Sequence, residues 1–302
     1  MFFGFAFIHS SGFNRPSSFL THMRLTFLIP IICMFLIAFD GAAQKDQNGD
    51  WVWLNGNNQL NQNTSRGNLQ VTSPSNNPDG RVGMMSWTDN GGNLWIFGGG
   101  NADTYNDIWE FNSTTLVWTW MAGPSTPNQS SVYGTLGTPS PSNLPGLRGE
   151  SATWTDHDGN FWLFGGRGVD SAGNVGYLND LWEFSPSTLQ WTWMGGSNVF
   201  PTCPSTNSCG SSGVYGTLGT PAPGNIPPGR AGAVTWTDAS GNLWLFGGRI
   251  YVVYLNGWTG YENDLWKYSP ATNQWTWMGG QSSLPSDCGL IRSCGWAGLY
   301  GA

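Results

Sequence analysis

One pattern of aromatic and glycine residues occurs three times along this chain of 302 residues, and its core segments align without gaps. The copies open with an arginine and read "RVGMMSWTD", "RGESATWTD" and "RAGAVTWTD" from Arg81, Arg148 and Arg230. After a short turn come "LWIFGG", "FWLFGG" and "LWLFGG", then "NDIWEF", "NDLWEF" and "NDLWKY", and finally a "WTWM" segment. In every copy, 16 positions separate the arginine from the phenylalanine before the two glycines. Each copy therefore holds four short segments joined by turns.

These segments have the character of β-strands. Aromatic residues favour strands and turns consume glycine and proline, and the chain has 19 Trp, 44 Gly and 18 Pro with only 10% charged residues. The segments "LWIF" and "LWLF" are apolar on both sides of the pleat, which is expected when both faces of a sheet are covered. Four short antiparallel strands, repeated, are typical of β-propeller blades. The sequence therefore predicts an all-β fold of three four-stranded blades.

Tryptophan is the residue that we expect to pack these blades together. Fifteen of the nineteen Trp residues recur at five positions of the repeat. Repetition across blades is what packing requires, so we interpret these side chains as core rather than as a ligand platform. They are Trp87, Trp154, Trp236, Trp95, Trp162, Trp244, Trp109, Trp182, Trp266, Trp118, Trp191, Trp275, Trp120, Trp193 and Trp277.

The motifs of the repeat also resemble those of a known family. The arginine that opens the first strand, the diglycine after an apolar strand and the sequence "NDLWEFSPSTLQWTWM" at Asn179–Met194 are similar to kelch repeats, as in the central propeller of galactose oxidase. The resemblance covers Arg81 to about Gly280 and implies a kelch-type β-propeller. Kelch propellers serve as protein-binding modules, as glycan-binding modules or as domains of enzymes. The arginines here are 67 and 82 positions apart, whereas kelch repeats run about fifty residues.

The segment "WVWLNG" at Trp51–Gly56 has the sequence of a fourth strand without the three strands that precede it elsewhere. Kelch-like propellers commonly close by letting an N-terminal strand complete the last blade, so the resemblance implies that role here. Residues 299–302, "LYGA", match the start of the linkers "VYGTLGTPSPSNLPG" and "VYGTLGTPAPGNIPP" that follow the first two blades. Since propellers typically have four or more blades, we expect a partial ring, with this chain either an N-terminal fragment of a longer protein or an incomplete gene model.

The N-terminal part of the chain reads as a targeting segment. Residues 23–43 hold one arginine, an uncharged apolar run and then small residues, which is typical of a cleaved secretory signal. We expect residues 1–22 to be an upstream extension, and the protein to be secreted or at the cell surface without a stable membrane span. The alternative is an anchor formed by the uncleaved apolar run, which falls just short of a spanning helix. The remaining regions are 44–80 with the closing strand and a linker, and the blades with their linkers at 81–147, 148–229 and 230–302.

Loops at one end of the blades are the expected place for recognition. In an antiparallel blade, the second-to-third connections and the linkers between blades share one end. The second-to-third connections hold six, twelve and fourteen residues, and variable loops on a rigid scaffold commonly carry function. Two cysteine pairs with equal spacing fall in matching insertions of the linkers, Cys203 with Cys209 and Cys288 with Cys294. In a secreted protein they predict two local disulfides rather than a metal site.

The third of these loops, Arg249–Glu262, is the best candidate for direct ligand contact. Its aromatic residues have no counterparts in the other copies, and together with an arginine they could stack on sugar rings or anchor a peptide. The alternative is that they pack within their own long loop. The candidate residues are Arg249, Tyr251, Tyr254, Trp258 and Tyr261.

One arginine and one aspartate recur in every copy. A functional interpretation places the arginines at a channel mouth, where they would bind an anion. Their identity in all copies favours a structural clamp between the arginine and the aspartate or a backbone carbonyl, because function seldom needs identical copies. The residues are Arg81, Arg148, Arg230, Asp107, Asp180 and Asp264.

The sequence offers no catalytic residues that we can assign. Beyond residue 43, His157 is the only histidine, and its place in a hairpin turn predicts exposure, so we expect neither a catalytic triad nor a copper site. We expect no metal or cofactor, and the formal charge of −8 beyond residue 43 argues against nucleic acid. The expected function is a non-catalytic binding module for an unknown protein or carbohydrate ligand. The alternative is the propeller domain of a larger carbohydrate-active or oxidase-like enzyme whose catalytic residues lie outside this chain.

Overall fold

The computed structural model describes residues 52–56, 65–100, 104–200, 209–252, 258–282 and 293–295. The chain divides into two units, Met1–Val52 and Trp53–Ala302, and the strands among the described residues belong to the second unit. The predicted signal segment lies outside the described residues. In the described ranges, no helix is long and apolar enough to cross a membrane.

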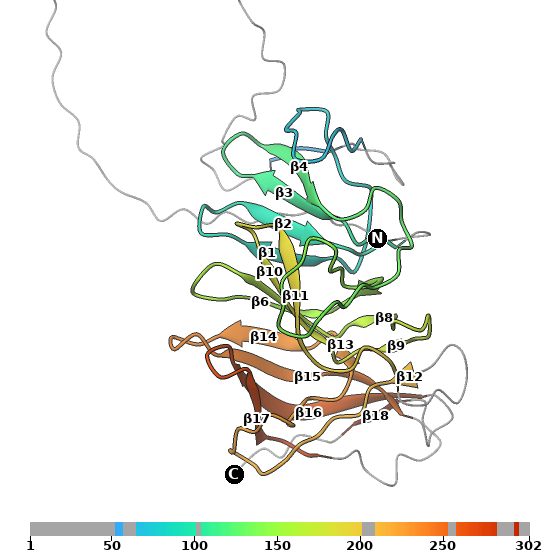
Figure 1. Ribbon diagram of the computed structural model, residues 1–302, viewed down its shortest axis with the longest axis vertical. Helices are drawn as coiled ribbons and strands as arrows, with labels where there is room; N and C mark the ends of the chain where they lie inside the picture. Colours follow the sequence, from blue (N-terminus) through green and yellow to red (C-terminus); the bar gives the residue numbers. More distant parts are fainter. Residues whose placement is uncertain are drawn as a thin grey trace, which may run out of the picture. The chain divides into compact units, whose positions relative to one another are not determined.

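The first two copies of the repeat each form a four-stranded antiparallel sheet, and the four strands of the third copy belong to a six-stranded sheet, which confirms the predicted all-β fold (Figure 1). Blade 1 consists of β1 (Met85–Thr88), β2 (Leu94–Phe97), β3 (Ile108–Asn112) and β4 (Val117–Ala122). Blade 2 consists of β6 (Ala152–Thr155), β7 (Phe161–Phe164), β10 (Leu181–Ser185) and β11 (Gln190–Gly195). Blade 3 consists of β14 (Val234–Thr237), β15 (Leu243–Val252), β16 (Trp258–Ser269) and β17 (Gln274–Gly279).

The turn between the first two strands of each blade is built around an aspartate. In blade 1, Asp89 Oδ1 accepts hydrogen bonds from the backbone amides of Gly91 and Asn93, at 2.8 and 2.9 Å. Its second oxygen, Oδ2, accepts a hydrogen bond from Trp95 Nε1 at 2.9 Å. Asp156 and Asp238 repeat both features in blades 2 and 3. The turn therefore fixes the register of each hairpin, since a side chain satisfies its free backbone amides.

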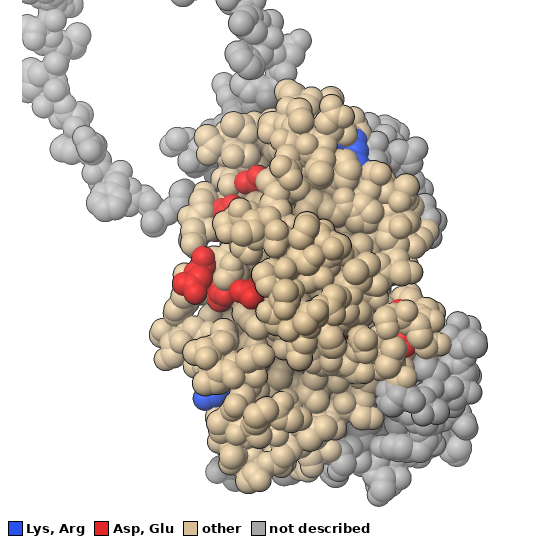
Figure 2. Space-filling view, viewed as in Figure 1, with Lys and Arg blue, Asp and Glu red and all other residues tan. Residues whose placement is uncertain are grey.

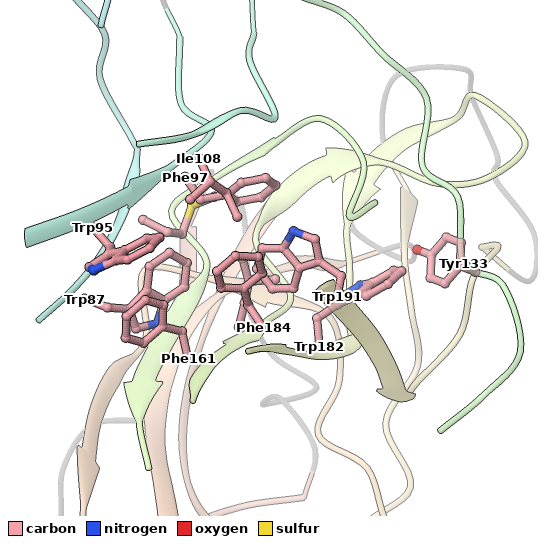
Figure 3. Close-up of a cluster of buried hydrophobic side chains, with 11 residues drawn as sticks. Trp87, Trp95, Phe97, Ile108, Tyr133, Phe161, Trp182, Phe184 and Trp191 are labelled. Carbon is pink, nitrogen blue, oxygen red and sulfur yellow. The ribbon is translucent and has the colours of Figure 1, made fainter. Parts of the chain in front are cut away.

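Aromatic side chains fill the space between neighbouring blades. Figure 3 shows the cluster between blades 1 and 2, in which Trp87 stacks on Phe161 with ring centroids 5.3 Å apart. Trp87 Nε1 also donates a hydrogen bond to the backbone carbonyl of Trp162 at 3.0 Å. Between blades 2 and 3, Trp154 Nε1 donates to the carbonyl of Trp244 at 2.8 Å. The buried indoles are therefore satisfied by the next blade, as buried polar groups need to be.

The first strands of the three blades lie side by side, with β6 next to both β1 and β14. Threonine side chains join them. Thr235 and Thr237 of β14 donate hydrogen bonds to the carbonyls of Thr153 and Thr155 of β6, at 2.9 and 3.0 Å. The blades therefore pack in chain order through their innermost strands as well as through their faces.

The structure differs from two expectations about the strands. The first strand of each blade does not run on from its arginine, because positive φ angles of 67°, 59° and 68° at Gly83, Glu150 and Gly232 interrupt it. In blades 2 and 3 the arginines lie in separate short strands, β5 (Arg148–Gly149) and β13 (Arg230–Ala231). The predicted lone fourth strand at Trp51–Gly56 is also wrong, since Val52–Gly56 belong to no strand. A strand needs a partner, and within the described ranges none pairs with this segment.

Charged groups are sparse on the surface drawn in Figure 2, in keeping with a chain of which 10% is charged. Most of the acidic groups in this view lie toward the left, level with the turns that Figure 1 draws at the left ends of blades 1 and 2, and a few lie on the right. Among the acidic residues near these turns, Glu183 has its pKa raised by burial and by Asp156 and Asp158. The turn end is therefore an acidic region without a cluster of residues suited to a metal among the described ranges.

Candidate binding face

The second-to-third connections are extensions of the sheets rather than free loops. In blade 3, β15 and β16 continue beyond the blade as one hairpin, in which Arg249 pairs with Tyr261 and Ile250 with Gly260. This corrects the expectation of a fourteen-residue loop at Arg249–Glu262. In blade 2, the corresponding segment forms β8 (Arg167–Val169) and β9 (Val175–Tyr177). The face at this end is therefore carried by hydrogen-bonded ladders, which position side chains more firmly than a loop would.

Two of the five predicted ligand-binding residues have described side chains. The Tyr261 residue is 46% exposed. The Arg249 side chain is 40% exposed and forms an ion pair with Glu150 of blade 2. Tyr251 and Trp258 lie in β15 and β16 by their backbones, and Tyr254 lies outside the described residues. The structure therefore places an exposed aromatic ring and an exposed ion pair at this end of blades 2 and 3.

Glu150 has an unusual backbone for a residue that is not glycine. Its φ of 59° lies in the left-handed region, and blades 1 and 3 have Gly83 and Gly232 at the same position. Its amide donates to the carbonyl of Gly83 at 3.0 Å, and its carbonyl accepts from the amide of Gly232 at 2.8 Å. Three blades therefore meet at Glu150, while its side chain points to Arg249 rather than into the core.

The second cysteine of each predicted pair lies in a short strand that pairs in parallel with the preceding hairpin. Cys209 lies in β12 (Cys209–Gly210) and pairs in parallel with Gly176 of β9. Cys294 lies in β18 (Ser293–Gly295) and pairs in parallel with Gly260 of β16. Gly176 and Gly260 each lie three residues before the asparagine of their "NDLW" segments, so the register is equivalent. Cys203 and Cys288 lie outside the described residues, and the two disulfides stay a prediction.

The recurring arginines are buried inside the blades. In blade 2, both terminal nitrogens of Arg148 lie 2.7 Å from the oxygens of Asp180, and Nη1 also donates to the carbonyl of Gly165 at 3.0 Å. Burial alone would lower the pKa of Arg148, but Asp180 outweighs it and holds that pKa above its ordinary value. Asp180 also accepts a hydrogen bond from Trp182 Nε1 at 2.8 Å. Arg81 with Asp107 and Arg230 with Asp264 repeat this arrangement. These six residues therefore lie away from any ligand in solvent.

A fourth group joins this clamp, and our reading of the motifs missed it. Tyr133, in the linker after blade 1, donates its hydroxyl to Asp180 of blade 2 at 2.7 Å, and Tyr215 does the same to Asp264 of blade 3. Burial and the neighbouring carboxylate raise the pKa of both tyrosines. The linkers therefore bind the blade that follows them.

In blade 1, an arginine replaces this tyrosine. Arg66 Nη1 lies 2.7 Å from Asp107 Oδ2, and its guanidinium lies over the ring of Trp120 at 5.0 Å. The signal was present in the sequence, because "SRGNLQVTSPSN" aligns without gaps with "VYGTLGTPSPSN", and 15 positions separate Arg66 from Arg81, as they do Tyr133 from Arg148. Replacement of the tyrosine by an arginine hid the match.

One carboxyl oxygen near this end of the blades is buried without a hydrogen-bond partner among the described residues. It is the Oε2 atom of Glu262. Burial and the nearby Asp264 raise the pKa of Glu262 to about 7, although Arg230 opposes this. The group therefore changes charge near neutral pH. His157, by contrast, is exposed in its hairpin turn at the other end, as predicted.

No protein-family model matches the sequence, and no curated protein matches it. Among solved structures, that of YjhT is similar to this chain, with 18% sequence identity and a TM-score of 0.41. The alignment covers 69% of this chain and 55% of YjhT, so the chain spans little more than half of that protein. The fold assignment rests on the three blades described above. Membership of the kelch family and the likeness to galactose oxidase stay predictions from the sequence.

Proposed function

We propose that the protein is a non-catalytic binding module that recognises a protein or a glycan through the end of blades 2 and 3 that carries Glu150, Arg249 and Tyr261. The proposal includes a kelch-type repeat, secretion or cell-surface display, and two disulfides in the linkers of this end, all of which rest on the sequence.

The observation that carries the proposal is the exposed Tyr261 beside an exposed ion pair on an extended hairpin. The Arg249 and Tyr261 backbones pair directly across β15 and β16, so their side chains stand on the same side of the ladder. A tyrosine ring offers a flat apolar surface with a hydroxyl, and the ion pair offers donors and acceptors for polar groups of a ligand. Sugars and peptides both combine such groups.

Glu150 supports the same proposal. A left-handed backbone costs a residue other than glycine about 1 kcal/mol, and an exposed ion pair returns no more than about that amount. Stability alone therefore does not explain a glutamate where the other two blades have glycine. Residues in strained conformations cluster at functional sites, and Glu150 holds the guanidinium of Arg249 in place.

Glycan arrays and peptide arrays test the proposal when they are probed with the full chain. We expect a ligand whose affinity falls about tenfold or more in Tyr261→Ala, because buried tyrosines are common hot spots of interfaces. Arg249→Ala should weaken the same ligand. His157→Ala is the matched control, since this exposed residue lies at the opposite end of the blades. A ligand that is lost in His157→Ala and retained in Tyr261→Ala would refute the assignment of the face.

A further inference from the structure

One face of blade 3 is apolar and exposed, whereas the same face of blades 1 and 2 is buried. Val234, Trp236 and Phe246 are 62%, 43% and 44% exposed. Their counterparts in the other blades are at most 5% exposed, and they are Met85, Trp87, Phe97, Ala152, Trp154 and Phe164. The prediction that all recurring tryptophans are core is therefore wrong for Trp236. Large apolar groups that recur in a repeat and lie exposed at one copy indicate an interaction surface.

In blades 1 and 2 the following blade covers this face. Phe97 of blade 1 packs on Trp191 of blade 2, and Phe164 of blade 2 packs on Trp275 of blade 3, with ring centroids 5.1 and 5.3 Å apart. The first-strand tryptophan of each blade also donates its indole hydrogen bond to the next blade. This face of a blade, which we call the socket, thus packs against a sheet that carries aromatic residues at fixed positions.

Trp236 has a different partner. Its ring stacks on Trp244 of its own hairpin, with centroids 5.5 Å apart and planes within 10°. Among the described residues, Trp236 Nε1 donates to no carbonyl, whereas Trp87 Nε1 and Trp154 Nε1 each do. When no blade adjoins this position, we expect its indole to be exposed and to stack on its own sheet.

A second copy of this chain does not offer the matching surface. The covering faces of blades 2 and 3 come from their second, third and fourth strands, and blade 1 has the same residue types there. In blade 1, however, Ile96, Trp109 and Phe111 of that face are already buried. Among the described residues, no free face of the covering kind is left for a second copy to use.

The linkers indicate where the occupant comes from. After blades 1 and 2, the "VYG" motif brings Tyr133 and Tyr215 to an aspartate of the next blade in the same polypeptide. The sequence after blade 3 repeats this motif as "LYG" at residues 299–301. We propose that Val234, Trp236 and Phe246 form the docking surface for a further four-stranded blade of the same repeat, connected to blade 3 by this linker.

The chemistry of the occupant follows from the two junctions already present. It carries a phenylalanine or leucine at the start of its second strand to face Trp236, and a carbonyl on that strand to accept from Trp236 Nε1. It carries a tryptophan at the start of its fourth strand to pack on Phe246. Trp236 then leaves Trp244 and turns toward the new blade, as Trp87 turns toward Phe161.

Cysteine reactivity tests this proposal. Val234→Cys is placed in the full chain, and in the same chain with a second copy of residues 218–302 appended after Ala302, so that 15 positions separate Tyr300 from the appended arginine as they do Tyr215 from Arg230. We expect Val234→Cys to react readily with a maleimide in the full chain and to lose most of its reactivity in the extended chain. Val82→Cys is the matched control, because Val82 is 70% exposed outside the socket and should react equally in both.

A second measurement uses Trp236 itself. The difference in fluorescence emission between the parent and Trp236→Phe gives the contribution of the Trp236 indole. In the extended chain this contribution should shift to shorter wavelength, and acrylamide should quench it less. Equal reactivity of Val234→Cys in both chains would overturn the proposal. An appended copy that stays unfolded would do the same, because a docking blade should fold on this face. Protection of Val234→Cys through dimerisation of the full chain would assign the surface to a second copy instead.

Discussion

Glu150 occupies a position of the repeat where the other two blades have glycine. The repeat requires a left-handed backbone there, and glycine supplies it in the two other blades. Glu150 adopts the same conformation and directs its carboxylate to Arg249. The packing of the blades therefore does not need this side chain, which agrees with the proposed role of Glu150 at the binding face.

Two substitutions at this position separate the backbone from the side chain. Glu150→Gly removes both the strain and the ion pair, whereas Glu150→Ala removes the ion pair and keeps the strain. We expect Glu150→Gly to exceed Glu150→Ala in free energy of unfolding by about 1 kcal/mol. Urea denaturation of the two variants measures the difference. Equal stability of both would mean that the left-handed backbone at position 150 is not strained.

Glu262 makes the stability of the protein depend on pH. Its pKa is raised by burial from 4.5 to about 7 in the folded chain, so the folded protein binds more protons than the unfolded chain between these values. The free energy of unfolding that Glu262 contributes therefore decreases as pH rises from about 4.5 to 7. The loss amounts to about 3 kcal/mol at most.

The matched control for this prediction is Glu262→Gln, which has the same shape and no titratable proton. Denaturant unfolding of both proteins across this pH range should show the parent losing stability relative to Glu262→Gln as pH rises. A constant difference between the two would show that Glu262 titrates normally and that Asp264 and Arg230 do not perturb it.

The residues of the clamp show how far sequence reasoning reaches at this scale. The arginine and the aspartate were found because they are identical in all three copies. The tyrosines that bind the same aspartates were not, because Arg66 takes their place in blade 1 and breaks the identity. A position that exchanges a hydroxyl for a guanidinium while it keeps the same partner cannot be found by identity alone.

At the scale of the elements, the extension of β15 and β16 is the main difference from expectation. Gly247 and Gly248 favour a chain break, and the following residues lack the repeat pattern, so the sequence indicates a loop. In the structure both glycines have positive φ, the register shifts between Phe246 and Gly248, and the ladder then resumes. A bulge of this kind lets a strand continue past glycines, which the local pattern does not reveal.

Hydrogen–deuterium exchange tests this extension directly. Amides that belong to the ladder of β15 and β16 between Arg249 and Val252 and between Trp258 and Glu262 should exchange slowly, because they are paired across the hairpin. The amides of Trp53 and Leu54, which belong to no strand, serve as the comparison and should exchange faster. Rapid exchange throughout Arg249–Val252 would restore the loop interpretation.

For the whole molecule, the repeat determines both what the sequence predicts and what it leaves open. The strand number, the pairing order and most of the aromatic core follow from identical positions in three copies. The binding face does not, because its residues occur once and their arrangement depends on contacts between blades, such as Glu150 with Arg249. Trp236 shows the same limit, since its burial depends on a neighbour rather than on its own sequence.

The central claim is that recognition takes place at the end of the blades that carries Glu150, Arg249 and Tyr261, on a scaffold that the buried clamps hold rigid. Hydrogen–deuterium exchange of the full chain, with and without the glycan or peptide found on the arrays, tests it most directly. The account predicts that the ligand slows exchange in the β15–β16 hairpin around Arg249 and Tyr261 and in the backbone next to Glu150. Protection confined to the hairpin turns at the opposite end, such as Asp156–Asn160, would contradict it.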